Sequence, residues 1–273
     1  MSEGTSGFIQ VPGAQLYYQV RGSGPVLFII AGGSGDAESF QAAGSFLEPC
    51  FTILSYDRRG YARSPLERPD EVAVVSIETQ SDDAHQLLAA LTTKPAYVFG
   101  SSIGALIGLD LILRHQEQIQ LLVAHEPPLR KFLGGEHEPP RGPIPQGSET
   151  PEQTIRRFAA SLGVGHSLVY GESEQAQARP PERKHQNAAF FIRHEAQAVS
   201  SYEVDLDGLR RVKDKILFAG GAEGREYFPY RGARKAANVL EAAFVEFPGK
   251  HGGYGEHPAQ FAEKLKQYLQ TYL

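Results

Sequence analysis

The chain has 273 residues, of which 41% are hydrophobic and 22% charged, so its composition is that of a globular protein that can bury a full core. A net charge of -5 at pH 7 provides no broad positive field, which argues against nucleic acid and anionic membrane surfaces as partners. We expect a cytoplasmic protein, because Cys50 is the single cysteine, there is no signal-peptide pattern, and the apolar runs are too short to span a bilayer.

The chain opens with two short segments on either side of a Pro-Gly turn, which predict a β-hairpin over residues 8–11 and 15–20. Later runs are largely apolar at consecutive positions, which is typical of strands that helices cover on both faces. Six such runs are expected to form one parallel sheet: 26–30, 51–54, 96–99, 121–124, 216–219 and 244–247. Helical patterns lie between them, over 39–47, 77–91, 103–114, 230–242 and 258–273. The alternation predicts an α/β fold with a doubly wound, mostly parallel sheet.

The interval between two of these strands, residues 129–206, breaks the alternation because it contains no strand-like run. It has a Gly/Pro-rich opening and helical stretches near 152–162 and 184–199. We therefore expect an inserted helical cap over one edge of the sheet. The predicted division is a core domain of residues 1–128 and 207–273 and a cap of residues 129–206.

Residues 100–104 (Gly-Ser-Ser-Ile-Gly) match the pattern G-x-S-x-G, which is weak evidence when it stands alone. Here the pattern directly follows a predicted strand and directly precedes a predicted helix, as a nucleophile elbow requires. Glycine at its first and last positions fits the close crossing of that strand and helix. We expect Ser102 to be the nucleophile and the backbone N–H of Ile103, at the start of the helix, to be an oxyanion donor. Ser101 is adjacent but lacks the central position.

A serine hydroxyl needs a base to take its proton, and nine histidines are available. His251 is preferred because it lies in a glycine-flanked loop, residues 248–254, after the last predicted strand. Loops at the carboxyl ends of the strands are where sheets of this kind place their sites.

The base in turn needs a carboxylate to hold its tautomer and stabilise the imidazolium. Glu126 follows the predicted strand 121–124, and Glu223 follows the next strand, 216–219. Either residue satisfies the chain order nucleophile, acid, histidine. Spacing does not decide between them.

These residues resemble the α/β-hydrolase superfamily over nearly the whole chain. Residues 56–64 (Tyr-Asp-Arg-Arg-Gly-Tyr-Ala-Arg-Ser) are similar to the segment that follows the fourth strand in that superfamily. Residues 31–35 (Ala-Gly-Gly-Ser-Gly) stand where its members carry a histidine-glycine oxyanion loop, with Ala31 in place of the histidine. The resemblance implies that Gly32 or Gly33 supplies the second oxyanion donor.

Within the superfamily, His125-Glu126-x-Pro and Pro248-Gly249-x-His251 resemble an esterase/lactonase branch that includes the zearalenone lactonases and related bacterial hydrolases. In that branch the glutamate after the sixth strand completes a catalytic triad, which implies Glu126 as the acid. Most of the superfamily uses the position after the seventh strand, so Glu223 is retained as the alternative.

Several further residues carry weaker expectations. We expect a structural ion network near the site, rather than catalytic groups, from the charged residues Asp57, Arg58 and Arg59. Aromatic residues of the cap are expected to line a substrate pocket: Phe132, Phe158, Phe190 and Phe191. No metal or organic cofactor is implied.

The sequence thus predicts a serine hydrolase that cleaves a carboxylic ester or lactone of a small molecule through an acyl-enzyme. An alternative keeps the triad but cleaves a carbon–carbon bond or forms a peracid. Dehalogenase and epoxide hydrolase chemistry is disfavoured because the elbow lacks an aspartate nucleophile. An alternative of another class is a ligand-binding receptor on a hydrolase scaffold. The natural substrate and the oligomeric state stay open.

Overall fold

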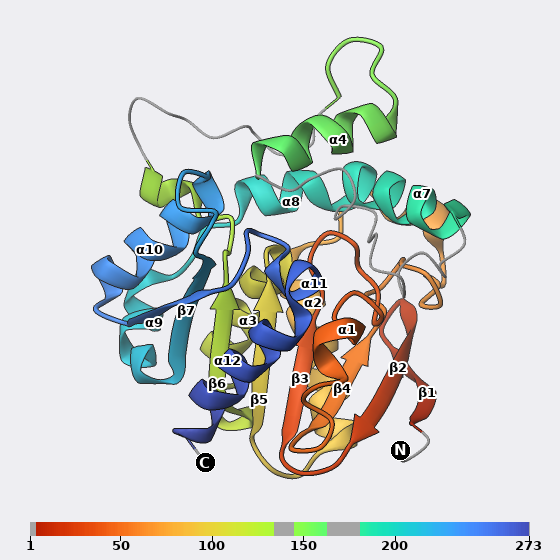
Figure 1. Ribbon diagram of the computed structural model, residues 1–273. Coiled ribbons are helices and arrows are strands. Elements are labelled where there is room, and N and C mark those ends of the chain that lie inside the picture. Colours follow the sequence, from red (N-terminus) through yellow and green to blue (C-terminus); the bar gives the residue numbers. More distant parts are fainter. Residues whose placement is uncertain (1–3, 134–144, 163–180, 273) are drawn as a thin grey trace.

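A single twisted sheet runs through the described part of the computed structural model, which comprises residues 4–133, 145–162 and 181–272 (Figure 1). The strand order is β1-β2-β4-β3-β5-β6-β7-β8. Strands β1 and β2 form an antiparallel hairpin, β2 pairs antiparallel with β4, and β3 to β8 are parallel. The strands are β1 Thr5–Val11, β2 Ala14–Gly22, β3 Val26–Ile30, β4 Thr52–Tyr56, β5 Ala96–Ser101, β6 Ile119–His125, β7 Ile216–Gly221 and β8 Ala243–Phe247.

Helices cover both faces of this sheet, as the apolar runs predict. One buried cluster joins the sheet to α2 (Ile77–Leu91), α3 (Ile103–Arg114) and α10 (Phe228–Leu240). A second cluster, on the opposite face, joins it to α1 (Gln41–Gly44) and α12 (Pro258–Gln270). Alternate residues of β3 belong to the two clusters, which explains why the strand is apolar at consecutive positions. The prediction of a doubly wound, mostly parallel α/β sheet is confirmed.

Beyond the carboxyl ends of the strands lies a layer of helices (Figure 1). Its described elements are α4 (Pro151–Ser161), α7 (Pro181–Phe190), a π-helical turn (Phe191–Glu195) and α8 (Ala196–Ser201). After α8 the chain returns to the sheet through α9 (Leu206–Arg211). We use the name cap for residues 129–206 as a proposed division; its residues 134–144 and 163–180 lie outside the described residues.

Two predicted helices differ from the structure. The pattern at 39–47 predicts one helix, whereas α1 ends at Gly44 and the chain continues in turns, because glycine and Pro49 disfavour a longer helix. The pattern at 184–199 predicts an unbroken α-helix, whereas a π-helical turn separates α7 from α8. The short helix α11 (Gly253–Glu256) was not predicted.

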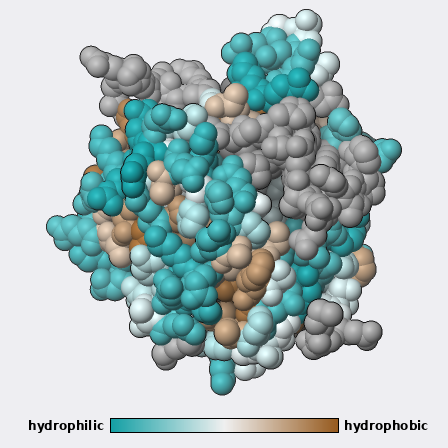
Figure 2. All heavy atoms as spheres, in the orientation of Figure 1, coloured by the Kyte–Doolittle hydropathy of each residue, from teal (hydrophilic) through white to brown (hydrophobic). Residues whose placement is uncertain are grey.

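The surface is that of a mostly polar molecule. Hydrophilic residues predominate on the face shown in Figure 2, and hydrophobic ones gather on limited areas of it. Among the described residues, the large apolar side chains that are exposed are Phe8, Phe46, Val74, Val239 and Tyr272. No helix in the described ranges is long and apolar enough to cross a membrane.

Helix α3 approaches the ends of strands β3 and β5 closely, and two glycines make this possible. A Cβ atom added at Gly104 would lie 2.8 Å from the carbonyl oxygen of Ala31 and closer still to that of Ile30. A Cβ atom added at Gly100 would lie 2.8 Å from the Cα atom of Ala105. Real Cβ atoms do not approach backbone this closely, so any larger residue would push the helix away from the sheet.

We therefore expect Gly104→Ala to lower the free energy of unfolding by about 2 kcal/mol or more, the cost of overpacking against fixed backbone. Urea unfolding followed by circular dichroism measures this change. Gly44→Ala is the matched control, because its added Cβ would meet no heavy atom closer than 3.7 Å. A Gly104→Ala protein as stable as the parent would contradict the argument.

Candidate active site

Ser102 occupies the turn between β5 and α3 in a conformation that few residues other than glycine adopt. Its backbone angles are φ 56° and ψ -122°, which places strain at this position. Its N–H donates to the carbonyl oxygen of His125 at 2.9 Å, and its carbonyl accepts from the N–H of Ala105 at 2.9 Å. Ser102 is partly exposed, whereas the adjacent Ser101 is buried. The turn thus has the backbone geometry expected of a nucleophile elbow.

Glu126 and His251 form a buried pair at the carboxyl edge of the sheet. Glu126 directly follows β6 and has a left-handed backbone, with φ 49°. Its Oε2 lies 2.6 Å from Nδ1 of His251, and the two side chains are only 1% and 10% exposed. A carboxylate at this distance favours the proton on Nδ1, which leaves Nε2 as the proton acceptor of the ring.

A pair of glycines at the end of β7 lets Glu126 reach this histidine. Strand β7 lies between β6 and β8, so the carboxylate has to pass over its end. Oε1 of Glu126 accepts from the N–H of Gly221 at 2.8 Å, and a Cβ atom on Gly220 would lie 3.3 Å from that same oxygen. A side chain at Gly220 would crowd this carboxylate, and one at Gly221 would meet the backbone carbonyls of Gly249 and Lys250 in the loop that carries His251. The sequence contains a signal for this arrangement, the pair Gly220-Gly221, which the spacing of the two glutamates does not take into account.

The environment of Glu126 keeps its carboxyl group ionised. Burial alone would raise the pKa of Glu126, but the hydrogen bond and charge of His251 lower it, with a further contribution from the Gly221 amide. The net result is a pKa below the ordinary value of a glutamate. Glu126 is therefore available as a permanent negative charge beside the imidazole.

Glu223, the alternative acid, occupies a different place. Its side chain is 60% exposed and lies 3.7 Å from Nε2 of His257 rather than beside His251. Its backbone N–H donates to the carbonyl of Gly249 at 3.0 Å. The geometry thus brings Glu126, and not Glu223, to the histidine.

Residues 31–35, which we call the glycine loop, lie next to Ser102. A Cβ atom on Gly32 would lie 3.4 Å from Cβ of Ser102. Gly33 lies under the ring of Phe191, because a Cβ added there would meet Cε2 of that ring at 3.7 Å. Ile103 is the first residue of α3, where backbone N–H groups have no partner within the helix. Of the three predicted oxyanion donors, Ile103 directly follows Ser102, Gly32 lies beside it, and Gly33 is the next residue in the same loop.

The four aromatic residues predicted to line a pocket all belong to the main buried cluster or pack against it. Phe191 contacts the glycine loop, and Phe190 packs edge-on against Tyr61 with ring centres 4.9 Å apart. Phe158 also packs against a smaller cluster that contains Phe228. Their role in a substrate pocket stays a prediction.

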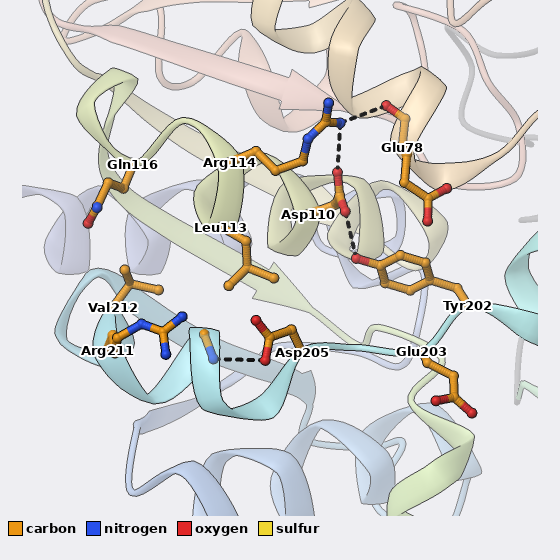
Figure 3. Close-up of a pocket in the computed structure, with 11 residues that line it drawn as sticks. Glu78, Asp110, Leu113, Arg114, Gln116, Tyr202, Glu203, Asp205, Arg211 and Val212 are labelled. Atoms are coloured by element: carbon orange, nitrogen blue, oxygen red, sulfur yellow. Dashed lines mark hydrogen bonds and ion pairs between the residues drawn. The ribbon is translucent and has the colours of Figure 1, made fainter.

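A separate pocket of about 570 Å³ lies away from these residues (Figure 3). Its polar groups bind one another: the Tyr202 hydroxyl donates to Asp110 at 2.9 Å, and Arg114 pairs with the same carboxylate. None of the predicted site residues lines this pocket. We interpret it as the place where the end of the cap is attached to α3. The described residues contain no cluster of three His, Cys, Asp or Glu side chains that could hold a metal ion.

Comparison with known proteins identifies the family of the chain. Residues 25–249 match the family described as the alpha/beta hydrolase fold. The chain therefore belongs to the α/β-hydrolase family, and it is a hydrolase of that type.

Particular relatives extend over almost the whole chain. The uncharacterized hydrolase YraK of Bacillus subtilis (strain 168) is 41% identical over 269 residues, which cover 97% of this chain and 96% of that protein. The zearalenone hydrolase of Bionectria ochroleuca is 25% identical over 272 residues, covering 96% of each. The crystal structure of ALR0039 from Nostoc sp PCC 7120, assigned to the α/β hydrolases, has a TM-score of 0.70 at 19% identity and covers 98% of each chain. That structural likeness shows the fold.

His125, immediately before Glu126, is a buried group whose environment the sequence did not reveal. It is fully buried, and neither ring nitrogen has a hydrogen-bond partner among the described protein atoms. Aromatic rings surround it, with the centre of Phe261 at 5.7 Å and that of Phe99 at 6.0 Å. Burial lowers the pKa of His125 to about 4, so the ring is neutral in the folded protein.

This lowered pKa makes stability depend on pH. Below the ordinary histidine pKa of 6.5 the unfolded chain binds a proton that the folded chain refuses until about pH 4, so stability falls as pH drops through this window. The loss for one such histidine is about 3 kcal/mol. We expect His125→Phe, which suits the aromatic surroundings, to reduce this acid sensitivity.

Urea unfolding of the parent and of His125→Phe between pH 8 and pH 4 measures the difference. His185→Phe, at an exposed position, is the control and should keep the pH profile of the parent. Parallel profiles for the parent and His125→Phe would contradict the assignment.

Proposed function

We propose that this hydrolase cleaves carboxylic esters or lactones through an acyl-enzyme formed on Ser102. The observation that carries the proposal is the buried contact of 2.6 Å between Glu126 and His251, next to a serine at a strained strand-to-helix turn. A nucleophile, a base and a group that orients the base are the parts that acyl transfer by serine requires.

In the first half of the reaction, Oγ of Ser102 attacks the substrate carbonyl carbon while its proton passes to Nε2 of His251. The carbonyl oxygen becomes an oxyanion, held by the amides of Ile103 and of Gly32 or Gly33. Glu126 stabilises the positive charge that forms on the imidazole. When the tetrahedral intermediate collapses, the bond to the leaving alkoxide breaks and His251 gives it the proton.

In the second half, His251 takes a proton from water as the water oxygen attacks the acyl carbon. The second tetrahedral intermediate collapses, the bond to Oγ breaks, and the proton returns to Ser102. A lactone follows the same steps, except that its alkoxide stays attached to the acyl group until the product leaves. Neither half requires a redox partner.

Three observations bear on this proposal. The elbow carries a serine, whose hydroxyl can take up an acyl group, and not the aspartate with which an epoxide hydrolase or dehalogenase attacks a saturated carbon. The relative from Bionectria ochroleuca is named for the hydrolysis of zearalenone, which supports hydrolysis of a small organic substrate. A receptor function would need the same site to bind ligand without turnover, and the ionised Glu126 beside His251 favours turnover.

Fluorophosphonate labelling and p-nitrophenyl acetate hydrolysis test the proposal. We expect the parent to be labelled at Ser102, identified by mass spectrometry of the peptide. Ser102→Ala should abolish labelling and lower kcat by at least about ten-thousand-fold. Ser101→Ala, at the buried neighbouring serine, is the matched control and should be labelled like the parent. A parent that is neither labelled nor active on esters or lactones would refute the proposal.

The two candidate acids are separated by the same assay. Glu126→Gln should lower kcat by about a hundred- to ten-thousand-fold, because it removes the charge that stabilises the imidazolium. Glu223→Gln, at an exposed position, should change kcat by no more than about twofold. The reverse order of effects would transfer the role of the acid to Glu223.

A further inference from the structure

Arg58 is a fully buried arginine that contacts the glycine loop from behind. Its Nη2 donates to the carbonyl oxygen of Gly32 at 2.9 Å. Its Nη1 donates to Oε1 of Glu195 at 2.6 Å and also to the side chain of Gln80. The guanidinium lies over the ring of Tyr61, 4.5 Å from its centre. Arg58 thus connects helix α2, a cap residue and the glycine loop at one point.

The bond to Gly32 has a consequence for the next amide. The carbonyl of Gly32 and the N–H of Gly33 belong to one peptide unit, and the described chain contains no cis peptide bond. In a trans peptide these two groups point in opposite directions. The N–H of Gly35 also donates to the Gly32 carbonyl, at 3.0 Å. Holding that oxygen on one side therefore directs the N–H of Gly33 to the other side of the loop.

Glu195, the partner of Arg58, comes from the cap. It is the last residue of the π-helical turn and is 0% exposed. One carboxylate oxygen binds Arg58, and the other accepts from the hydroxyl of Tyr61 at 2.7 Å. Separating Arg58 from Glu195 would leave two buried charges without partners, which is strongly unfavourable. The π-helical turn and Arg58 therefore stay in a fixed position relative to each other.

Two further cap residues contact the same loop. Nδ2 of Asn187, in α7, donates to the carbonyl of Ser34 at 2.8 Å, and its Oδ1 accepts from the N–H of Ala62 at 3.2 Å. Phe191 begins the π-helical turn, four residues before Glu195, and lies against Gly33. One continuous helical stretch of the cap thus contacts the glycine loop directly at two points, through Asn187 and Phe191, and is connected to it at a third through Glu195 and Arg58.

We propose that Arg58, Glu195 and Asn187 are positioning residues that hold the glycine loop so that the Gly33 amide is directed at the oxyanion. This inference rests on the proposed function, because an oxyanion donor has a role only in acyl transfer. It assigns Gly33, rather than Gly32, as the second donor. It makes the cap a structural part of the oxyanion hole. The position of the helical stretch 181–201 then controls the rate of acyl transfer.

The chain offers a matched control in a second buried ion pair. Arg59, the next residue, binds Asp83 with Nε to Oδ2 at 2.6 Å, and both side chains are largely buried. Its other hydrogen bond within the described residues is to the carbonyl of Pro12, at 3.3 Å, and none is to the glycine loop. Arg59→Lys therefore reports the effect of weakening a buried pair that is not connected to that loop.

Steady-state kinetics with p-nitrophenyl acetate form the first test. Arg58→Lys and Glu195→Gln should lower kcat by about ten- to a hundred-fold with KM changed by less than about threefold, since a misdirected oxyanion donor weakens transition-state binding. Affinity for an aryl trifluoromethyl ketone, which forms an oxyanion adduct with the serine, should fall in parallel. Arg59→Lys should leave both quantities near those of the parent. Equal losses in Arg59→Lys, or no loss in Glu195→Gln, would overturn the proposal.

Amide hydrogen exchange of the segment 28–40 forms the second test and does not depend on activity. Exchange should be faster in Arg58→Lys, Glu195→Gln and Asn187→Ala than in the parent and Arg59→Lys. If Arg58→Lys does not fold, the other two variants decide. A parent without any turnover refutes the proposed function alone, and the exchange data then still decide whether the cap holds the loop. Unchanged exchange in Glu195→Gln and Asn187→Ala would overturn that link.

Discussion

The close approach of helix α3 to strands β3 and β5 is the constraint on which the rest of the site depends. Because Gly100 and Gly104 leave no space between the backbones, the chain has to reverse within Ser102, at a positive φ. A non-glycine residue in this conformation costs about 1–3 kcal/mol and persists only where neighbouring groups hold it. The bond from the Ser102 N–H to the His125 carbonyl is such a restraint. Because Glu126 directly follows His125, the same hydrogen bond also places Glu126 beside the elbow.

The position of the acid follows from the way charge is buried at this edge. A carboxylate removed from water is costly unless hydrogen bonds replace its solvation. Glu126 obtains one bond from the Gly221 amide and one from His251, and both depend on the small residues that end β7. Glu223 remains in water and gains nothing comparable from His257. The neutral, aromatic-lined His125 beneath this pair excludes water from it on the core side.

The sheet could be predicted because its signals are local. Apolar runs and Pro-Gly turns define strands and the hairpin within a few residues, and the elbow pattern lies between such signals. The choice between Glu126 and Glu223 could not be made in this way, because it depends on which side chain passes over a neighbouring strand. The π-helical turn was also missed, since one extra residue barely changes a helical pattern. The contact between Arg58 and Glu195 joins residues 137 positions apart, and no local pattern contains it.

The chemistry of the Arg58 contacts explains why a simpler arrangement would not serve the site equally well. Apolar residues of similar volume would attach a cap to the core without the desolvation cost of a buried ion pair. A guanidinium, however, is rigid and carries several donors, so it binds a carboxylate and a backbone carbonyl simultaneously and in a fixed relation. An apolar contact has no direction and could not orient the Gly32–Gly33 peptide. The cost of burying Arg58 and Glu195 is thus balanced by a fixed direction of the Gly33 N–H. That direction matters only if the Gly33 N–H stabilises the negative charge that develops on the oxyanion.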